Sequence, residues 1–365
     1  MKSVCIVVYR LAVGGAEQVV VEEIGEFLRR GYAVRLITLS PERTHSLMSL
    51  VSASCKKDMI EFHSLFDWRA LRVLAHLFRE TQPDIIITQM WFANTVGRIA
   101  ARWVGIHNHL LTFEQNVYDQ LKLKSWKQFL VDRCFQGWCR NIAAASHAIK
   151  ESLLRCGIDG RRVVVIHDAI DIARMTDANP SPIRGELGIE GKFVYLFVGR
   201  LVHQKGVDIL LNAFAQQQSG VLLIVGGGEE RAQLESEVEA LGIHSRVFFL
   251  GVRHDIPSLM KAADCFVLAS RLEGLGIVLI EAMACGIPVV ATNVDGIPEA
   301  VEHGENGILV PSEDPAAFAV ALRQIRENSD MRKSMGERGV ERAARLFSIE
   351  NHVTGILACF DKTRY

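Results

Sequence analysis

The stretch from Ser270 to Thr292 decides the fold: it reads SRLEGLGIVLIEAMACGIPVVAT. The apolar run CFVLA (265–269) comes just before it, and the stretch itself ends on a second apolar run, PVVAT (288–292). Between these two expected strands lie a Gly-Leu-Gly turn and an apolar segment suited to a buried helix. A strand, a glycine turn and a helix form an anion site, because the free N–H groups at the start of the helix point at the ligand.

Two glutamates frame this turn. Glu273 stands at the mouth of the turn, and Glu281 lies about two helical turns further on, near the same face, at ~3.6 residues per turn. One carboxylate before a phosphate-binding turn and one along the helix could grip two hydroxyl-bearing parts of one ligand, which suggests a nucleotide-sugar. The alternative is that Glu281 caps or pairs within the core while Glu273 is solvated.

The composition indicates a folded globular protein. The chain has 365 residues, enough for two or three domains, with 49% hydrophobic and 23% charged residues, which argues against a disordered chain. No apolar run reaches the ~18 residues that span a bilayer, and the first residues lack a secretory signal core. We therefore expect a cytoplasmic protein. The eight cysteines form no Cys-x-x-Cys pair, so buried reduced thiols are favoured over zinc ligands or disulfides.

Short β-branched runs alternate with helical patterns along the chain, starting at VCIVVY (4–9) and again at FVYLFV (193–198). Such alternation predicts an α/β fold with two doubly wound, Rossmann-like parallel sheets. The Pro- and Gly-rich segment 177–188 separates the two series. Ligands of these sheets bind outside the carboxyl ends of the strands, so we expect a cleft between the domains that is lined by the glycine turns.

Three further turns are candidates for ligand contact. In Gly199-Arg200-Leu-Val-His-Gln-Lys205-Gly206, the two cations could clamp a diphosphate, although solvated cations give the same pattern. The triple glycine 226–228 permits close approach of backbone to a base or ribose, and a plain turn explains it nearly as well. The turn at 14–17, Gly-Gly-Ala-Glu, is not G-x-G-x-x-G, which argues against a Rossmann dehydrogenase.

No metal site is expected, because the sequence has no Asp-x-Asp pair and no histidines at metal-ligand spacing. Arg200, Lys205 and the helix start after Gly274 could stabilise a leaving diphosphate instead. Residues 121–140 combine an apolar helical stripe with several lysines and arginines, and the first half of the chain is slightly basic. This pattern fits a helix on an anionic membrane surface or ordinary core packing.

Taken together, these motifs resemble those of retaining glycosyltransferases of family 4, which have the GT-B fold. The resemblance runs over essentially the whole chain and rests on Glu273-x7-Glu281, on Gly-Arg-Leu…Lys-Gly at 199–206, on Gly-Gly-Ala-Glu at 14–17, and on the segments 225–228 and 288–299. Leu275 stands where the family often has Phe, and His-Asp-Ala-Ile-Asp (167–171) replaces the family's Asn-Gly-x-Asp, which puts any inherited role of that loop in doubt.

The resemblance implies a division and a set of roles. An acceptor-side domain would span 1–176, a nucleotide-sugar domain 177–346, and a helix at 347–365 would return to the first domain. Catalysis would rest on Glu273, Arg200 and Lys205, and Glu281 would bind the ribose. The implied donor-binding residues are Gly15, Gly199, Arg200, Lys205, Gly226, Gly227, Gly274, Leu275, Gly276 and Glu281. The implied acceptor-side residues are Glu17, Glu114 and Asn116.

We therefore expect a metal-independent transferase without a cofactor. Its donor would be a nucleotide-sugar, UDP-linked before other nucleotides, and its acceptor a glycan or lipid-linked glycan in cell-surface polysaccharide, lipopolysaccharide or exopolysaccharide synthesis. It would not bind nucleic acid, and it could lie at the inner face of the cytoplasmic membrane. Two alternatives stay open: a nucleotide-sugar epimerase of the same fold, and a non-catalytic protein that only binds a nucleotide-sugar.

Overall fold

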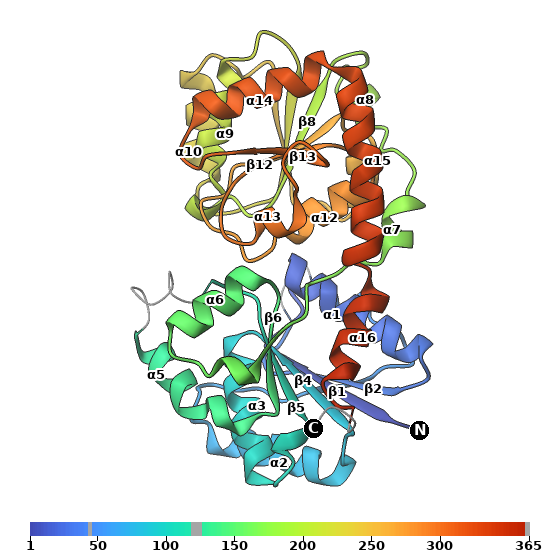
Figure 1. Cartoon of the computed structure of the whole chain (residues 1–365), viewed down its shortest axis with the longest axis vertical. Helices are drawn as coiled ribbons and strands as arrows, with labels where there is room; N and C mark the ends of the chain where they lie inside the picture. Colours follow the sequence, from blue (N-terminus) through green and yellow to red (C-terminus); the bar gives the residue numbers. More distant parts are fainter. Residues whose placement is uncertain (43–45, 118–125, 362–365) are drawn as a thin grey trace. The chain divides into compact units, whose positions relative to one another are not determined.

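The computed structural model describes residues 1–42, 46–117 and 126–361 (Figure 1). By its internal contacts the chain separates into two compact units. Unit 1 comprises Met1–Ala169 and Ile349–Tyr365, and unit 2 comprises Ile170–Ser348. Each unit is built on one parallel sheet with helices on both faces.

Unit 1 holds a seven-stranded sheet in the order β3-β2-β1-β4-β5-β6-β7. Its strands are β1 Ser3–Val8, β2 Ala33–Thr38, β3 Lys56–Met59, β4 Ile85–Gln89, β5 Leu110–Glu114, β6 Asn141–Ala144 and β7 Val163–Val165. Its helices are α1 Gly15–Arg29, α2 Trp68–Thr81, α3 Trp91–Trp103, α5 Trp126–Phe135, α6 His147–Arg155 and α16 Ile349–Ala358.

Unit 2 holds a six-stranded sheet in the order β10-β9-β8-β11-β12-β13. Its strands are β8 Val194–Val198, β9 Val221–Val225, β10 Val247–Gly251, β11 Cys265–Leu268, β12 Val289–Thr292 and β13 Gly307–Val310. Its helices are α7 Ile172–Thr176, α8 Ile183–Glu186, α9 Val207–Ala215, α10 Arg231–Ala240, α11 Ile256–Lys261, α12 Ile277–Ala284, α13 Ile297–Ala300, α14 Pro315–Glu327 and α15 Ser329–Leu346.

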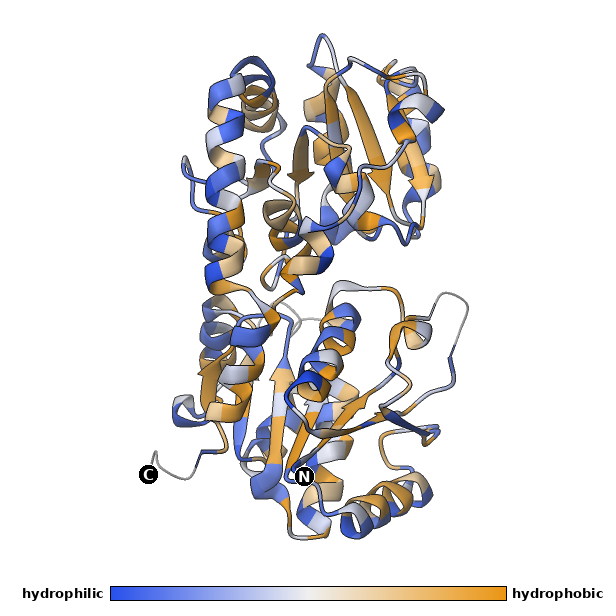
Figure 2. Ribbon diagram, turned by 90° about the vertical axis from the view of Figure 1, so that its right-hand side faces the viewer, coloured by the Kyte–Doolittle hydropathy of each residue, from blue (hydrophilic) through white to orange (hydrophobic). Residues whose placement is uncertain are grey.

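Burial explains why these segments become parallel strands. The central strands are continuous apolar runs, and every residue of β4 and β9 is buried, as expected for a sheet that is covered by helices on both faces. Figure 2 shows the apolar strands inside a layer of helices with polar outer faces. The fold class expected from the sequence is confirmed. No helix in the described part of the chain is long and apolar enough to cross a membrane.

The boundaries of the units differ from the expected ones. The sequence places 170–176 in the first domain, whereas the structure places these residues in unit 2. The reason is α7, which contacts α11 and α12 and buries Met175 completely. The last helix, α16, lies against α1 of unit 1, where the Arg30 guanidinium donates hydrogen bonds to Thr354 Oγ1 and to the Glu350 carbonyl. Polar contacts to Arg30, at the end of α1, thus hold α16 in unit 1 after the chain leaves unit 2 at 348–349.

Each sheet has one point where the strand order reverses. In unit 2, β8 has β9 on one side and β11 on the other, so the connections that leave β8 and β11 run in opposite directions. In unit 1 the same situation arises between β1 and β4. Ligands of doubly wound sheets bind at such points, outside the carboxyl ends of the strands. The loops after β8 and β11 are therefore the first place to look for a site.

Candidate functional site

The loops that follow β8 and β11 bring together two residues predicted to be catalytic. Lys205, at the end of the 3-10 turn His203–Lys205, donates from Nζ to Glu273 Oε2 at 2.5 Å. Both side chains are only 13% exposed. The Ser270 hydroxyl also donates to Glu273 Oε2, at 3.2 Å. Glu273 is therefore not simply solvated, and the site carries a compensated ion pair.

Arg200, the other predicted diphosphate ligand, lies two residues beyond the end of β8. Its side chain is exposed and makes no ion pair with any residue that the structure describes. The switch point thus presents one cation held by a carboxylate and one cation open to solvent, which is an arrangement that an anionic ligand could use.

Further hydrogen bonds and ion pairs connect the loop that follows β8 with the loop that follows β11. The Arg271 backbone N–H donates to the Gln204 carbonyl at 2.8 Å, and the Gln204 side-chain amide donates to the Leu272 carbonyl at 3.0 Å. The Arg271 guanidinium clamps both oxygens of Asp208, at 2.8 and 2.7 Å, and also pairs with Glu313. The position of Lys205 relative to Glu273 is therefore fixed by contacts on both sides of the pair.

The glycine turn before α12 has two structural demands of its own. Gly276 has φ +85°, a left-handed conformation that favours glycine. Gly274 and Gly296 pack so closely that a Cβ on Gly296 would lie 1.9 Å from the Gly274 carbonyl oxygen. The loop 294–296 also binds the turn directly, since the Glu273 N–H donates to Asp295 Oδ2 at 3.1 Å. The Asp295 carboxylate thus holds the backbone at the start of the glycine turn.

The glycines after β8 and β9 contact each other. Gly226 has φ +136°, and a Cβ there would lie 1.8 Å from the Gly199 carbonyl oxygen. The Leu201 N–H donates to the Gly227 carbonyl at 2.9 Å, so the two loops are also hydrogen-bonded. Close approach of one loop to the other thus accounts for Gly226. Gly227 has more room, because the atom nearest to its Cβ position is a Val252 methyl at 3.4 Å.

Glu281, the predicted ribose ligand, is paired within unit 2. It is the only charged residue of α12, its side chain is 12% exposed, and its Oε1 accepts from Arg174 Nη2 at 2.9 Å. Burial raises the pKa of Glu281, and the Arg174 guanidinium opposes that shift. No sequence pattern pointed to this partner, because Arg174 lies 107 residues away, in the segment assigned to the other domain.

In unit 1 the expected turn lies at the switch point between β1 and β4. α1 starts at Gly15, which is exposed, and Gly14 precedes it in extended backbone. The Glu17 carboxylate folds back over Gly14, where an added Cβ would lie 2.4 Å from Glu17 Oε2. On the β4 side, Met90 adopts φ 69° and ψ 151°, which is a strained conformation for a residue with a side chain.

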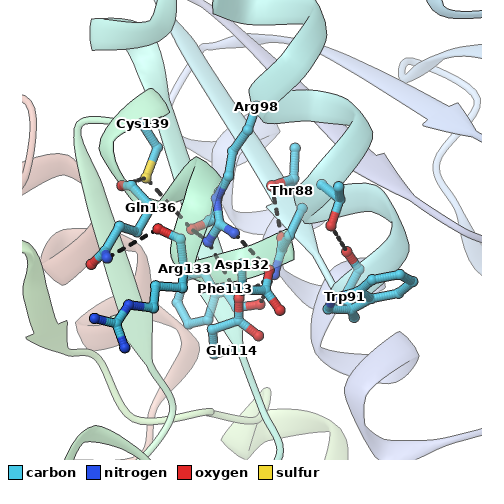
Figure 3. Close-up of polar contacts among 12 residues, drawn as sticks. Thr88, Trp91, Arg98, Phe113, Glu114, Asp132, Arg133, Gln136 and Cys139 are labelled. Atoms are coloured by element: carbon cyan, nitrogen blue, oxygen red, sulfur yellow. Dashed lines mark hydrogen bonds and ion pairs between the residues drawn. The ribbon is translucent and has the colours of Figure 1, made fainter. Parts of the chain in front are cut away.

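Glu114 lies in a buried network rather than at the surface (Figure 3). Its Oε1 accepts from the Asn94 amide at 3.0 Å and from Arg98 at 3.4 Å, and Arg98 also pairs with Asp132 at 3.0 Å. Burial and the nearby Asp132 raise the pKa of Glu114 to about 7, and burial raises that of Asp132 to about 6. Arg98 thus contacts the carboxyl groups of both Glu114 and Asp132 in the interior of unit 1. Asn116, two residues further on, is exposed.

The stretch 121–140 lies partly outside the described residues, since 118–125 are not described. Within the described part, Leu130 is 52% exposed and Arg133 is exposed, whereas Asp132 pairs inward with Arg98. Arg140 donates to the Cys359 carbonyl at 2.6 Å. Some of the expected surface charge is thus used for internal contacts, and membrane contact stays a prediction.

Comparisons with known proteins agree on one family. Two family models match, "Glycosyltransferase Family 4" over residues 13–174 and "Glycosyl transferases group 1" over residues 181–342. A D-inositol 3-phosphate glycosyltransferase of Geodermatophilus obscurus is 33% identical over 76% of this chain and 66% of its own length. An N-acetyl-alpha-D-glucosaminyl L-malate synthase of Bacillus anthracis is 30% identical over 58% of this chain and 57% of its own. The chain matches roughly half to two thirds of the length of these curated relatives.

Among solved structures, the Anabaena protein Alr3699/HepE in complex with UDP-glucose is similar over 98% of this chain and 100% of its own, with a TM-score of 0.84 and 24% identity. At that identity the likeness shows the fold. Together with the two parallel sheets, it confirms the GT-B fold class expected from the sequence.

Proposed function

The chain belongs to glycosyltransferase family 4, and from this premise we propose that it transfers a sugar from a nucleotide-sugar to an acceptor hydroxyl. The observation that carries the proposal is the pair of loops at the β8/β11 switch point. They hold Lys205 and Glu273 in contact; the first loop also carries the exposed Arg200, and the second leads into the start of α12. These are groups that bind a diphosphate and a hydroxyl-bearing sugar.

The donor we propose is a UDP-sugar. Arg200 and Lys205 would hold the diphosphate, the N–H groups near Leu275 and Gly276 would support it, and Glu281 would bind the ribose. The HepE structure, which contains UDP-glucose, supports a nucleotide-sugar of this kind. A nucleotide-sugar brings an anion for Lys205 and hydroxyl donors for Glu273, so it can replace the contact that these two residues make with each other.

The chemistry we propose is transfer with retention of the anomeric configuration. The bond between the anomeric carbon and the diphosphate oxygen breaks, the acceptor hydroxyl attacks the anomeric carbon from the same face, and its proton passes to the departing diphosphate. Lys205 and Arg200 would stabilise the negative charge that grows on the leaving diphosphate, and Glu273 would stabilise the positive charge on the sugar. We propose that no metal ion is needed, because these cations and the α12 amides supply the charge that a metal would bring.

The acceptor we propose first is a growing surface glycan, such as lipopolysaccharide or exopolysaccharide, with the protein in the cytoplasm at the inner face of the membrane. The names of the curated relatives favour a second class, small anionic hydroxyl compounds, since one names L-malate and the other D-inositol 3-phosphate. Purified protein should be offered one UDP-sugar with each acceptor class, including lipid-linked glycan in vesicles, and the product's anomeric configuration determined by NMR.

The first experiment is a thermal-shift panel of UDP, GDP, ADP and their sugar conjugates, with and without EDTA. A ligand that binds the folded protein raises its melting temperature in proportion to affinity and concentration. We expect UDP or a UDP-sugar to raise it, with or without EDTA. A cooperative melt that no nucleotide shifts would refute the donor. Conversion of the donor without any acceptor would favour an epimerase, and binding without turnover would favour a non-catalytic binding protein.

A further inference from the structure

The environment of Glu281 is unusual for a carboxylate. The helix α12 reads IVLIEAMA, and five of its eight residues are buried in the core of unit 2. Glu281 itself is only 12% exposed on this helix. A carboxylate in such a place is costly unless a counter-ion accompanies it, because burial favours the neutral acid.

The counter-ion comes from the segment that enters unit 2. α7 begins three residues after the unit boundary at Ala169, contacts α12 and carries Arg174 (Figure 1). Asp171 caps α7 by accepting from the Arg174 backbone N–H at 3.3 Å, and Met175 is fully buried. These contacts anchor the backbone of α7 around Arg174. The Arg174 guanidinium therefore extends to Glu281 from a backbone position that is held in place.

The two oxygens of Glu281 have different surroundings. Oε1 accepts from Arg174 Nη2 at 2.9 Å, while Oε2 has no hydrogen-bond partner among the described residues. The other titratable groups near this helix are Cys285, whose pKa burial raises to about 12, and the cation Lys261 of α11. On the α15 side, the buried residues that meet α12 carry no charge. Arg174 is thus the cation in direct contact with Glu281.

We propose that Arg174 is a positioning residue that fixes the Glu281 carboxylate with Oε2 left to accept hydrogen bonds from ribose hydroxyls, so that α7 helps to select ribonucleotides over deoxyribonucleotides. The inference rests on the proposed function, because it takes Glu281 as the ribose ligand. An ionised carboxylate is a stronger hydrogen-bond acceptor than the neutral acid. Arg174 therefore acts on the nucleotide through Glu281 without touching it.

The test measures affinities for UDP and 2′-deoxy-UDP by calorimetry between pH 6 and 9, in wild type, Arg174→Gln and Glu281→Gln. Wild type should prefer UDP at least tenfold, with little pH dependence. In Arg174→Gln the pKa of Glu281 rises further, so UDP affinity should fall about tenfold or more near pH 6 and recover toward pH 9. In Glu281→Gln the preference should be lost at every pH, because no carboxylate is left to titrate.

The control is Arg338→Gln, which removes an arginine that pairs with Glu305 at 2.6 Å on the exposed side of α15. It should bind both nucleotides like wild type. If Arg174→Gln melts too low to assay, Arg174→Lys serves, since the shorter lysine keeps a cation without the guanidinium geometry, and a reduced preference is expected. Wild-type preference and a flat pH profile in a folded Arg174 variant would overturn the inference. Wild-type protein that binds no nucleotide would instead overturn the proposed function.

Discussion

Replacing Lys205 by Met separates the two roles that the structure gives this residue. In the ligand-free protein, the Lys205 ammonium compensates Glu273 at 2.5 Å, with both side chains 13% exposed. In the complex we propose, the same ammonium binds the donor diphosphate. Lys205→Met removes both interactions, whereas the double variant Lys205→Met/Glu273→Gln removes the ligand contact but leaves no unpaired charge.

The structure sets the size of the effects. Breaking one side of a fully buried pair costs about 3–5 kcal/mol, and the residual exposure here reduces the expected loss to about 2–3 kcal/mol for Lys205→Met. That corresponds to a melting temperature lower by about 5–10 °C in a unit of this size. The double variant should regain most of this loss. A charge-assisted hydrogen bond contributes about 1.5–3 kcal/mol, so UDP affinity should fall about 10- to 100-fold in both variants.

The assay is a thermal melt of each variant at several UDP concentrations, with Lys192→Met as the control because Lys192 is an exposed lysine of the same unit. Only the single variant should lose stability, and both variants should lose the UDP-dependent shift. Recovery of UDP binding in the double variant, or wild-type binding in Lys205→Met, would refute the assignment of Lys205 to the diphosphate.

Three other predictions test the remaining structure. The pKa of Glu114 is raised to about 7 in the folded protein. This carboxyl group therefore keeps its proton at pH values at which the unfolded chain has already released it. Wild type should thus lose about 2 kcal/mol of stability between pH 5 and 8 relative to Glu114→Gln, as urea unfolding would show. Burial works to lower the pKa of His352, but the hydrogen bond at 2.7 Å and the charge of Glu23 outweigh it and raise the pKa. That contribution is complete below about pH 6.5 and fades as pH rises through the raised pKa, so His352→Phe should cost about 3 kcal/mol at pH 6 and less at pH 9 in the same assay. Gly226→Ala should lower the melting temperature strongly, because its Cβ would meet a carbonyl oxygen at 1.8 Å, whereas Gly227→Ala should stay near wild type.

Most strands could be predicted from the sequence, and the exception has a physical cause. The expected runs at 193–198, 265–269 and 288–292 form β8, β11 and β12 within one residue of their expected limits. β3 was missed because it reads KKDM and lies at the edge of its sheet, where three of its four residues are exposed and no apolar run is required. Strand prediction relied on burial, so an exposed edge strand gave no signal.

The site could be predicted as a set of residue types but not as a set of contacts. The Glu-x7-Glu spacing and the Arg/Lys loop both follow strands, so their meeting at the switch point follows from parallel topology. The partner of Glu281 did not follow, because α7 was assigned to the other domain and nothing in its sequence points to α12. Gly226 was interpreted as a close approach to a ligand or as a plain turn, whereas the structure shows that a Cβ there would meet the Gly199 carbonyl oxygen, so the approach of the two loops already requires this glycine.

The two glutamates of the site differ in how their counter-ions are held, and this difference bears on ligand exchange. Lys205 lies on the loop that follows β8, as Arg200 does, and in the complex that we propose the donor diphosphate replaces Glu273 as its partner. Arg174 sits on an anchored helix that the ligand is not expected to touch, so Glu281 keeps its counter-ion throughout. In the complex that we propose, binding of a nucleotide-sugar would break one ion pair, at Glu273, whereas Glu281 would need no rearrangement to bind the ribose. If the proposed roles hold, the nucleotide end of the donor would stay bound to an anchored carboxylate, while Glu273 would be released from Lys205 to contact the sugar.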